Sequence, residues 1–345
     1  MADINSSLEI KQLVKAEKEQ INSHAFIDTH THFDAPVFDI DRAQQVQQAY
    51  MQGVRHLVLV GYLYRYFERM YDTKQAISQL FSTKFESQDN DNDNDNDNDN
   101  AYLHTHIALG LHPFYIDQHT EEHLTQLEQL IVERRPLAIG EIGLDTFNHE
   151  MKAPDIFAKQ KRFFEAQLDM AVRHQLPVML HIRKAHAEAL AILKANVYDA
   201  HKLGGIAHSF SGGTQEAKAF VKLGFKLGVT GQITNPNAKK LRRAIAAAVN
   251  SYGIECLVIE TDCPDMTPIM CQTPDHSYDL SERNLGVKSD HGVTHDRNVP
   301  ANLPWVLSSL SELLGISHAR LVRQLWQNSC DALKVEWSYP INSPE

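Results

Sequence analysis

The chain has 345 residues, of which 43 % are hydrophobic and 22 % charged, a composition typical of a globular protein with a sizeable core. No apolar run reaches the roughly 18 residues that a membrane span needs, and the N-terminus lacks the basic start and apolar core of a secretory signal. The four cysteines form no CxxC pair, which favours reduced thiols in a cytoplasmic protein over a four-thiolate zinc site.

The formal net charge of −11 is concentrated in one tract. Residues 89–100 are six Asp-Asn repeats that hold six acids and no base, which leaves −5 on the rest of the chain. So mild an acidity argues against a protein that coats DNA through a basic surface. It does not argue against a nuclease that holds phosphate through bound metal, and 19 histidines make metal binding worth testing.

Three segments are expected to lie outside the regular fold. Residues 1–24 are predicted to be an N-terminal extension. Residues 86–101, which contain the Asp-Asn tract, are predicted to be a disordered insertion because such repeats bury no apolar surface. Residues 266–300 are polar and rich in Pro, Gly and Asp, and are predicted to be a long loop. The remainder of residues 25–340 is predicted to be a single domain.

Short apolar runs alternate with helical patterns along that domain. The predicted strands are 25–29, 54–61, 106–111, 137–142, 177–181, 205–209, 225–230 and 256–261. Helices are predicted between them, over 41–51, 120–134, 156–174, 185–196, 214–223 and 238–247. Strands that are nearly all apolar and are each followed by a helix are parallel and buried on both faces. Eight such units predict an α/β fold of the (β/α)8 TIM-barrel type. A doubly wound open sheet is the alternative, but no GxGxxG follows the first strand.

Histidines and carboxylates recur at the carboxyl ends of the predicted strands, where barrel enzymes carry their catalytic groups. These residues are His30 and His32 after the first strand, Glu141 in the fourth, His181 in the fifth, His208 in the sixth and Asp262 after the eighth. Residues i and i+2 of an extended chain point to the same side, so His30 and His32 can face one cation. Four imidazoles and two carboxylates at one mouth can hold two divalent cations, with one carboxylate bridging.

Each histidine alone is as readily a core or capping residue, so the joint pattern carries the prediction. Glu141 and Asp262 weigh most in it, because a buried carboxylate is costly without a partner. The pair His104 and His106 has the same spacing as His30 and His32 but stands at the start of a strand. We therefore expect that second pair to face the bottom of the barrel or the helix layer, away from metal.

The motifs FIDTHTHFD (26–34), LGLHP (109–113), IGEIGLD (139–145), PVMLHIRKAH (177–186), GIAHSFSGG (205–213) and IETDCPD (259–265) resemble those of the TatD family of metal-dependent deoxyribonucleases. Their order and spacing are close to its YjjV-type branch, and the resemblance runs from about residue 26 to 333. It implies a barrel of the amidohydrolase-like superfamily that hydrolyses phosphodiesters. It also implies one cation held by His30, His32, Glu141 and Asp262, and a second held by Glu141, His181 and His208. Val299 stands where the family has an acid, and Cys263 where it usually has Ala.

Roles follow from that arrangement. Two cations polarise a phosphoryl oxygen and lower the pKa of a shared water. Asp262 is the expected general base and Glu141 the expected bridge. Arg183 and His112 are expected to bind the substrate phosphate, because a guanidinium matches phosphate bidentately. The identity of the two divalent cations (Zn, Mn, Mg, Co or Ni) is not encoded in these ligands.

DNA, single-stranded or at its ends, is the expected substrate, and nothing indicates a membrane or an obligate protein partner. Two other functions stay open. One is an ester or amide hydrolase of the same barrel superfamily, such as an aminoacyl-tRNA deacylase, and the other is a non-catalytic metal-binding barrel. The intact ligand set weighs against the latter. A lysine that forms a bridging carbamate would favour amide hydrolysis, whereas Glu141 favours phosphodiester hydrolysis.

Overall fold

A computed structural model of the chain describes residues 24–85, 102–272, 287–288 and 294–340. The predicted N-terminal extension up to residue 23 and the whole predicted insertion at 86–101 lie outside the described residues. So do 273–286 and 289–293 of the predicted loop at 266–300.

Eight strands form one parallel sheet whose spatial order is the sequence order. They are β1 (Phe26–Thr31), β2 (Val54–Val60), β3 (His104–Leu109), β4 (Ala138–Asp145), β5 (Val178–Arg183), β6 (Ile206–Ala207), β7 (Lys226–Val229) and β8 (Leu257–Ile259). Backbone hydrogen bonds join the first strand to the segment after the last: Asp262 N donates to His30 O over 2.9 Å, and His32 N donates to Cys263 O over 2.8 Å. The predicted TIM barrel is thereby confirmed.

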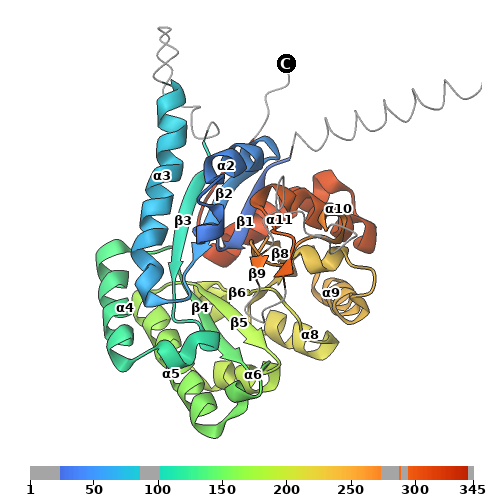
Figure 1. Cartoon of the computed structure of the whole chain (residues 1–345). Helices are drawn as coiled ribbons and strands as arrows, with labels where there is room; N and C mark the ends of the chain where they lie inside the picture. The colour runs from blue at the N-terminus through green and yellow to red at the C-terminus, as the bar shows by residue number, and fades with distance from the viewer. Residues whose placement is uncertain (1–23, 86–101, 273–286, 289–293, 341–345) are drawn as a thin grey trace, which may run out of the picture.

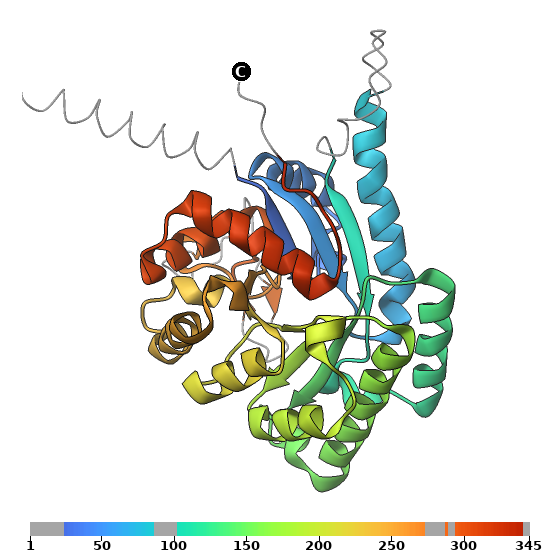
Figure 2. The ribbon, with the colours of Figure 1, turned by 180° about the vertical axis from the view of Figure 1, so that it is seen from behind.

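Helices surround the strands (Figures 1 and 2). They are α2 (Arg42–Met51), α3 (Phe67–Phe85), α4 (Glu121–Arg134), α5 (Pro154–His174), α6 (His186–Ala195), α7 (Ala200–Leu203), α8 (Thr214–Lys222), α9 (Lys239–Tyr252), α10 (Leu303–Leu314) and α11 (His318–Leu333). Among the helices of the described residues, none combines the length and apolarity needed to cross a membrane.

Helix α5 shows how the helical layer positions the mouth of the barrel. Its buried residues recur at the i, i+3, i+4 spacing of one helix face, and two of them are glutamines. Gln160 exchanges two hydrogen bonds with the backbone of Asp145, of 2.8 and 2.9 Å. Gln167 does the same with the backbone of Leu111, over 2.7 and 3.3 Å. The helix thus holds the ends of β4 and β3 by satisfying backbone groups that would otherwise be buried unpaired.

Element boundaries depart from the prediction at three places. β1 continues to Thr31, so His30 lies within the strand, and β3 begins two residues early at His104. β6 has only two residues, because Gly204 and Gly205 before it adopt φ values of 84° and 138°. The described part of the segment 266–300 contains a 3-10 turn (Ile269–Cys271) and the antiparallel pair β9 (Val287–Lys288) and β10 (Thr294–His295).

The second HxH pair packs at the start of β3, among aromatic residues. His106 Nε2 lies 3.0 Å from Nδ1 of His56, and both rings stack on Trp337 in the segment after α11, at 4.3 and 4.0 Å between centroids. Burial lowers the pKa of His56 to about 2 and that of His106 to about 3, so these imidazoles are neutral. His106 shares its side of β3 with Ala108, which packs in one cluster with Val58, Val60 and Trp337 inside the strands. Of the two expected places, His106 therefore occupies the bottom of the barrel.

Deleting residues 89–100 should leave the melting temperature and the turnover nearly unchanged. The tract is joined to the end of α3 and the start of β3, both at the barrel face opposite the carboxyl ends of the strands, and α3 projects past its neighbours (Figure 1). Calorimetry and an activity assay on the deletion variant test this. A large drop in either quantity would make the tract a working part of the protein.

Replacing either HxH pair should separate their roles. We expect His104→Ala and His106→Ala to keep the metal content per folded protein, although His106→Ala loses packing against Trp337. His30→Ala or His32→Ala should lower the metal content, because these residues stand at the other end of their strand. Elemental analysis of the purified variants measures this, and equal metal loss from both pairs would contradict it.

Candidate metal centre

The six predicted metal-binding residues converge at the carboxyl ends of the strands. They come from five strands or from the turns after them: His30 in β1 and His32 after it, Glu141 in β4, His181 in β5, His208 after β6 and Asp262 after β8. Five of them, with His112 after β3, line a cleft of about 540 Å³, while His30 lies fully buried beneath it. Residues separated by up to 232 positions are therefore neighbours, as the positions of the strand ends predict.

Glu141 lies at the centre of this group and is 1 % exposed. Its Oε2 lies 3.2 Å from Nε2 of His30 and 3.4 Å from Nε2 of His32. Its Oε1 lies 2.8 Å from Nδ1 of His181 and 3.6 Å from Nε2 of His208. Oε1 also lies 3.2 Å from Nε2 of His112. The two carboxylate oxygens thus face different sets of imidazoles, as the oxygens of a carboxylate shared by two cations would.

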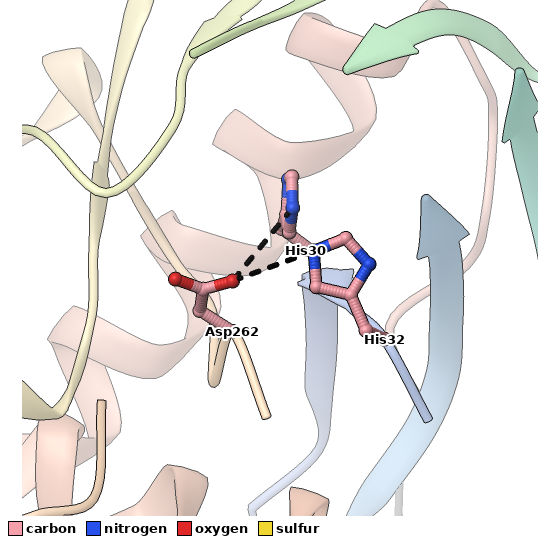
Figure 3. A group of neighbouring side chains, drawn as sticks. All are labelled: His30, His32 and Asp262. Atoms are coloured by element: carbon pink, nitrogen blue, oxygen red, sulfur yellow. Dashed lines mark ion pairs between the residues drawn. The ribbon is translucent and has the colours of Figure 1, made fainter. Parts of the chain in front are cut away.

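Asp262, which follows β8, faces His30 and His32 of the neighbouring β1 segment. Figure 3 shows His30 and His32 both directed toward its carboxylate, and Oδ1 lies 3.9 Å and 3.8 Å from their Nε2 atoms. Its Oδ2 lies 3.5 Å from Nε2 of His208. Asp262 adopts a left-handed φ of 55°, a conformation that Asp accepts more readily than most residues.

Hydrogen bonds to two histidines assign which ring nitrogen keeps a lone pair. His32 Nδ1 lies 3.0 Å from the carbonyl oxygen of Val60, so it donates and leaves Nε2 as the acceptor. His208 Nδ1 forms an ion pair with Oε1 of Glu260 over 2.9 Å without hydrogen-bond geometry, and its Nε2 faces Glu141 and Asp262. His181 is reversed: Nε2 lies 2.9 Å from Oδ2 of Asp145, which leaves Nδ1 beside Glu141. Metal-bound histidines characteristically donate their remote N–H in this way.

His112 directs its N–H, and not its lone pair, toward Glu141. Its Nδ1 accepts the backbone N–H of Phe114 over 3.0 Å, so the proton of the neutral ring is on Nε2. That nitrogen lies 3.2 Å from Oε1 of Glu141 and 3.2 Å from Nδ1 of His181. His112, Glu141 and His181 are close enough to share an ion, but the tautomer makes His112 a donor at the site and not a metal ligand.

The ionisation of the site reflects burial opposed by close partners. Burial raises the pKa of Glu141, but the imidazoles of His112, His30 and His208 outweigh burial and hold that pKa well below its ordinary value. Burial would lower the pKa of His208, whereas the charges of Asp262, Glu260 and Glu141 raise it well above the usual value. The carboxylates therefore stay ionised and draw positive charge to the site.

The donor set fits divalent cations. The imidazole nitrogens of His30 and Oε2 of Glu141 are buried without a hydrogen-bond partner, although His30 Nε2 points at that oxygen. Buried polar atoms without partners are rare unless an ion or water satisfies them. Two other groups of three, His30/His32/Asp262 and His30/His208/Glu260, also place their ligand atoms within 4.8 Å of one another. A cation would replace the protons that these carboxylates now attract to the imidazoles.

Three further carboxylates orient the group. Besides pairing with His208, Glu260 accepts Ser209 N over 2.6 Å and the Thr29 hydroxyl over 3.1 Å. Asp28 accepts the backbone N–H and the hydroxyl of Thr261, over 2.8 and 2.5 Å, and burial raises its pKa to about 7. Asp145 holds the His181 ring. Glu260 was not among the predicted site residues, although a carboxylate in an apolar strand is the signal that selects Glu141.

Arg183, a predicted phosphate-binding residue, lies at the end of β5 and lines the cleft. Its guanidinium carbon lies 3.7 Å above the centroid of the Phe147 ring, with Lys184 Nζ 4.3 Å from the same ring. Stacking of this kind fixes the plane of a guanidinium while leaving its N–H groups at the edge.

Comparisons with known proteins show which family the chain resembles. The family model described as TatD related DNase matches residues 27–334. The chain is 36 % identical to an uncharacterized metal-dependent hydrolase, YjjV, of Escherichia coli (strain K12), over 70 % of this chain and 80 % of that protein. It is 34 % identical to a protein of Pantoea sp. (strain At-9b) named 3'-5' ssDNA/RNA exonuclease TatD, over 63 % of this chain and 76 % of that protein.

A solved structure extends the likeness to the fold. The crystal structure of the TatD homologue YJJV from Escherichia coli K12 superposes with a TM-score of 0.69 and 30 % sequence identity, covering 90 % of this chain and 98 % of that one. The family match spans the barrel from β1 to the end of α11. The chain therefore belongs to the TatD family of metal-dependent hydrolases.

Proposed function

We propose that this protein is a metal-dependent deoxyribonuclease that hydrolyses phosphodiester bonds of single-stranded DNA or of DNA ends as an exonuclease. The observation that carries the proposal is the division of Glu141 between two pairs of imidazoles, at 3.2 and 3.4 Å from one oxygen and 2.8 and 3.6 Å from the other. Two-metal sites of this kind serve enzymes that transfer or hydrolyse phosphoryl groups.

The ligand assignment follows the lone pairs. One divalent cation would be held by His30 Nε2, His32 Nε2, Asp262 and Oε2 of Glu141, and the second by His181 Nδ1, His208 Nε2 and Oε1 of Glu141. Bound divalent cations supply Lewis-acid polarisation of the phosphoryl group and make water a stronger nucleophile near neutral pH.

The chain's own residues then divide the remaining work. Asp262 is an ionised carboxylate at the cleft, because the charge of His208 and a hydrogen bond from it outweigh burial and lower its pKa. It can therefore accept a proton from the attacking water. His112 presents Nε2–H at the same cleft and can donate to a phosphate oxygen. Arg183 holds a non-bridging phosphate oxygen from its stacked position on Phe147.

Nucleic acid as the substrate is supported by the relatives named as ssDNA/RNA exonucleases. The deciding experiment is metal analysis of the purified protein, together with degradation of end-labelled single-stranded DNA under added Mg²⁺, Mn²⁺ or Zn²⁺. Mononucleotide release that depends on the metal supports the proposal. Intact DNA, together with hydrolysis of an aminoacyl ester or amide, would move the protein to the other branch of the barrel hydrolases.

Two carboxylate variants separate metal binding from proton transfer. Glu141→Ala should empty or disorder the whole site, because it removes the shared ligand. Asp262→Asn keeps a neutral oxygen but cannot accept a proton. We expect it to retain at least the metal held by His181 and His208, and to lose hydrolysis on the order of 100-fold or more. Elemental analysis and turnover on the same preparations measure both effects. Near-normal turnover in a metal-loaded Asp262→Asn variant would remove Asp262 as the base.

Arg183→Ala should act mainly on substrate binding. We expect KM for DNA to rise by roughly 10-fold or more, since a charge-assisted hydrogen bond contributes about 1.5–3 kcal/mol, while the metal content stays unchanged. The matched control is Arg162→Ala, which removes an exposed guanidinium on α5 that pairs with Glu121 outside the cleft. An unchanged KM for Arg183→Ala, or an equal rise for both variants, would contradict this role.

A further inference from the structure

One side of the cleft is built from aromatic rings. Tyr62 after β2 and Phe114 and Tyr115 after β3 line the cleft and are half-buried; we call these three residues the aromatic wall. The Tyr62 ring lies 5.4 Å from the ring of His32, and the Tyr115 ring lies 5.7 Å from that of His112. The two tyrosine rings are themselves 5.6 Å apart. The aromatic wall therefore adjoins His32 and His112 of the candidate metal centre.

Ring contacts and backbone hydrogen bonds hold the aromatic wall in place. Tyr66, outside the cleft lining, lies 5.4 Å from Tyr62, and Phe114 meets Tyr115 edge to face at 5.2 Å. The two loops are also joined through their backbones, since His112 N donates to Tyr62 O and Tyr115 N donates to His112 O, each over 3.2 Å. Rings fixed in this way lose little conformational entropy when a ligand stacks on them.

The other side of the cleft is polar. It is lined by Arg183 at the end of β5 and by Ser209, Ser211 and Gln232 from the loops after β6 and β7, and in an eight-stranded barrel β6 lies opposite β2. Among the lining residues that the structure describes, Arg183 is the one lysine or arginine, against the four acids Glu141, Asp145, Asp262 and Asp265. Such a cleft offers a polyanion one basic side chain, so phosphate binding would rest on Arg183 and on the bound cations of the proposed function. Stacking on the aromatic rings is a further source of binding energy, and it acts on the base and not on the phosphate.

We propose that the aromatic wall binds the nucleobase next to the scissile phosphate by stacking on Tyr62 and Tyr115, and so selects unpaired nucleotides. This inference rests on the proposed nuclease function and adds the residues that choose the substrate. A base within a duplex has both faces covered by its neighbours, so only a single-stranded or frayed end presents a face to these rings. Every base has such a face, so the wall selects unpaired strands and not a sequence.

The test measures binding of two probes to full-length protein carrying Asp262→Asn, which slows cleavage. The probes are a fluorescein-labelled eight-nucleotide oligothymidylate and the same oligomer with abasic sites, in the presence of Mn²⁺. We expect Tyr62→Ala and Tyr115→Ala each to raise Kd for the oligothymidylate by about 5- to 150-fold, and to leave Kd for the abasic oligomer unchanged. Tyr62→Phe and Tyr115→Phe should bind like the parent, because the ring is kept.

Tyr252→Ala is the matched control, since Tyr252 is a 41 % exposed tyrosine at the end of α9, outside the cleft lining. Equal affinity of the parent for the two oligomers, or alanine variants that bind both oligomers as the parent does, would overturn the inference. Cleavage by the wild-type protein separates this failure from failure of the proposed function. If both oligomers are cleaved with equal kcat/KM, the proposed nuclease function is supported and the role of the aromatic wall is overturned. If the oligothymidylate binds through the tyrosines but is not cleaved, the role of the aromatic wall is supported and the proposed nuclease function is overturned.

Discussion

The arrangement of this protein depends on one buried carboxylate. Glu141 is 1 % exposed in β4, where an ionised group without partners would cost several kcal/mol. Five imidazoles lie 2.8–3.6 Å from its oxygens, supplied by β1, β5 and the turns after β1, β3 and β6. These positions exist only when the barrel is closed, and the hydrogen bonds that join β1 to the segment after β8 involve His30, His32 and Asp262 themselves. Closing the barrel therefore brings His30, His32 and Asp262 to Glu141.

The positions of the site residues could be predicted because they depend on local patterns. Apolar runs separated by helices locate the strand ends, and the alternation along a strand places His30 and His32 on one side. The ring nitrogens that His32 and His181 present could not be predicted, since they depend on Val60 and Asp145 of other strands. The hydrogen bonds from α5 to the ends of β3 and β4 could not be predicted for a similar reason. Gln160 and Gln167 are polar residues of a helix, and only the fold shows that they bind the backbone of Asp145 and Leu111.

The two HxH pairs show how position along a strand decides chemistry. His30 and His32 meet Glu141 of another strand at the carboxyl end of the barrel, so imidazole and carboxylate can bind one cation together. His106 meets His56 and the Trp337 ring at the other end, where burial lowers its pKa and keeps the imidazole neutral. Two-residue spacing alone therefore says little about metal binding. β3 begins early because His104 and Thr105 pair with His56 and Leu57 of β2.

The candidate ligands and the cleft walls both stand at the carboxyl ends of the strands, but they differ in burial: His30, Glu141, His208 and Asp262 are buried, whereas Tyr62, Tyr115 and Arg183 are half-buried. The candidate ligands stand in the strands or within three residues of their ends, where backbone pairing fixes them. Tyr62, Tyr115 and Arg183 stand at or just beyond strand ends, where a change of side chain leaves the sheet intact. A substitution in the wall can therefore alter which molecule is held without disturbing the charges around Glu141. In the proposed function, the ligand set would carry out the hydrolysis, whereas the rings and the guanidinium around it would select which phosphodiester reaches it.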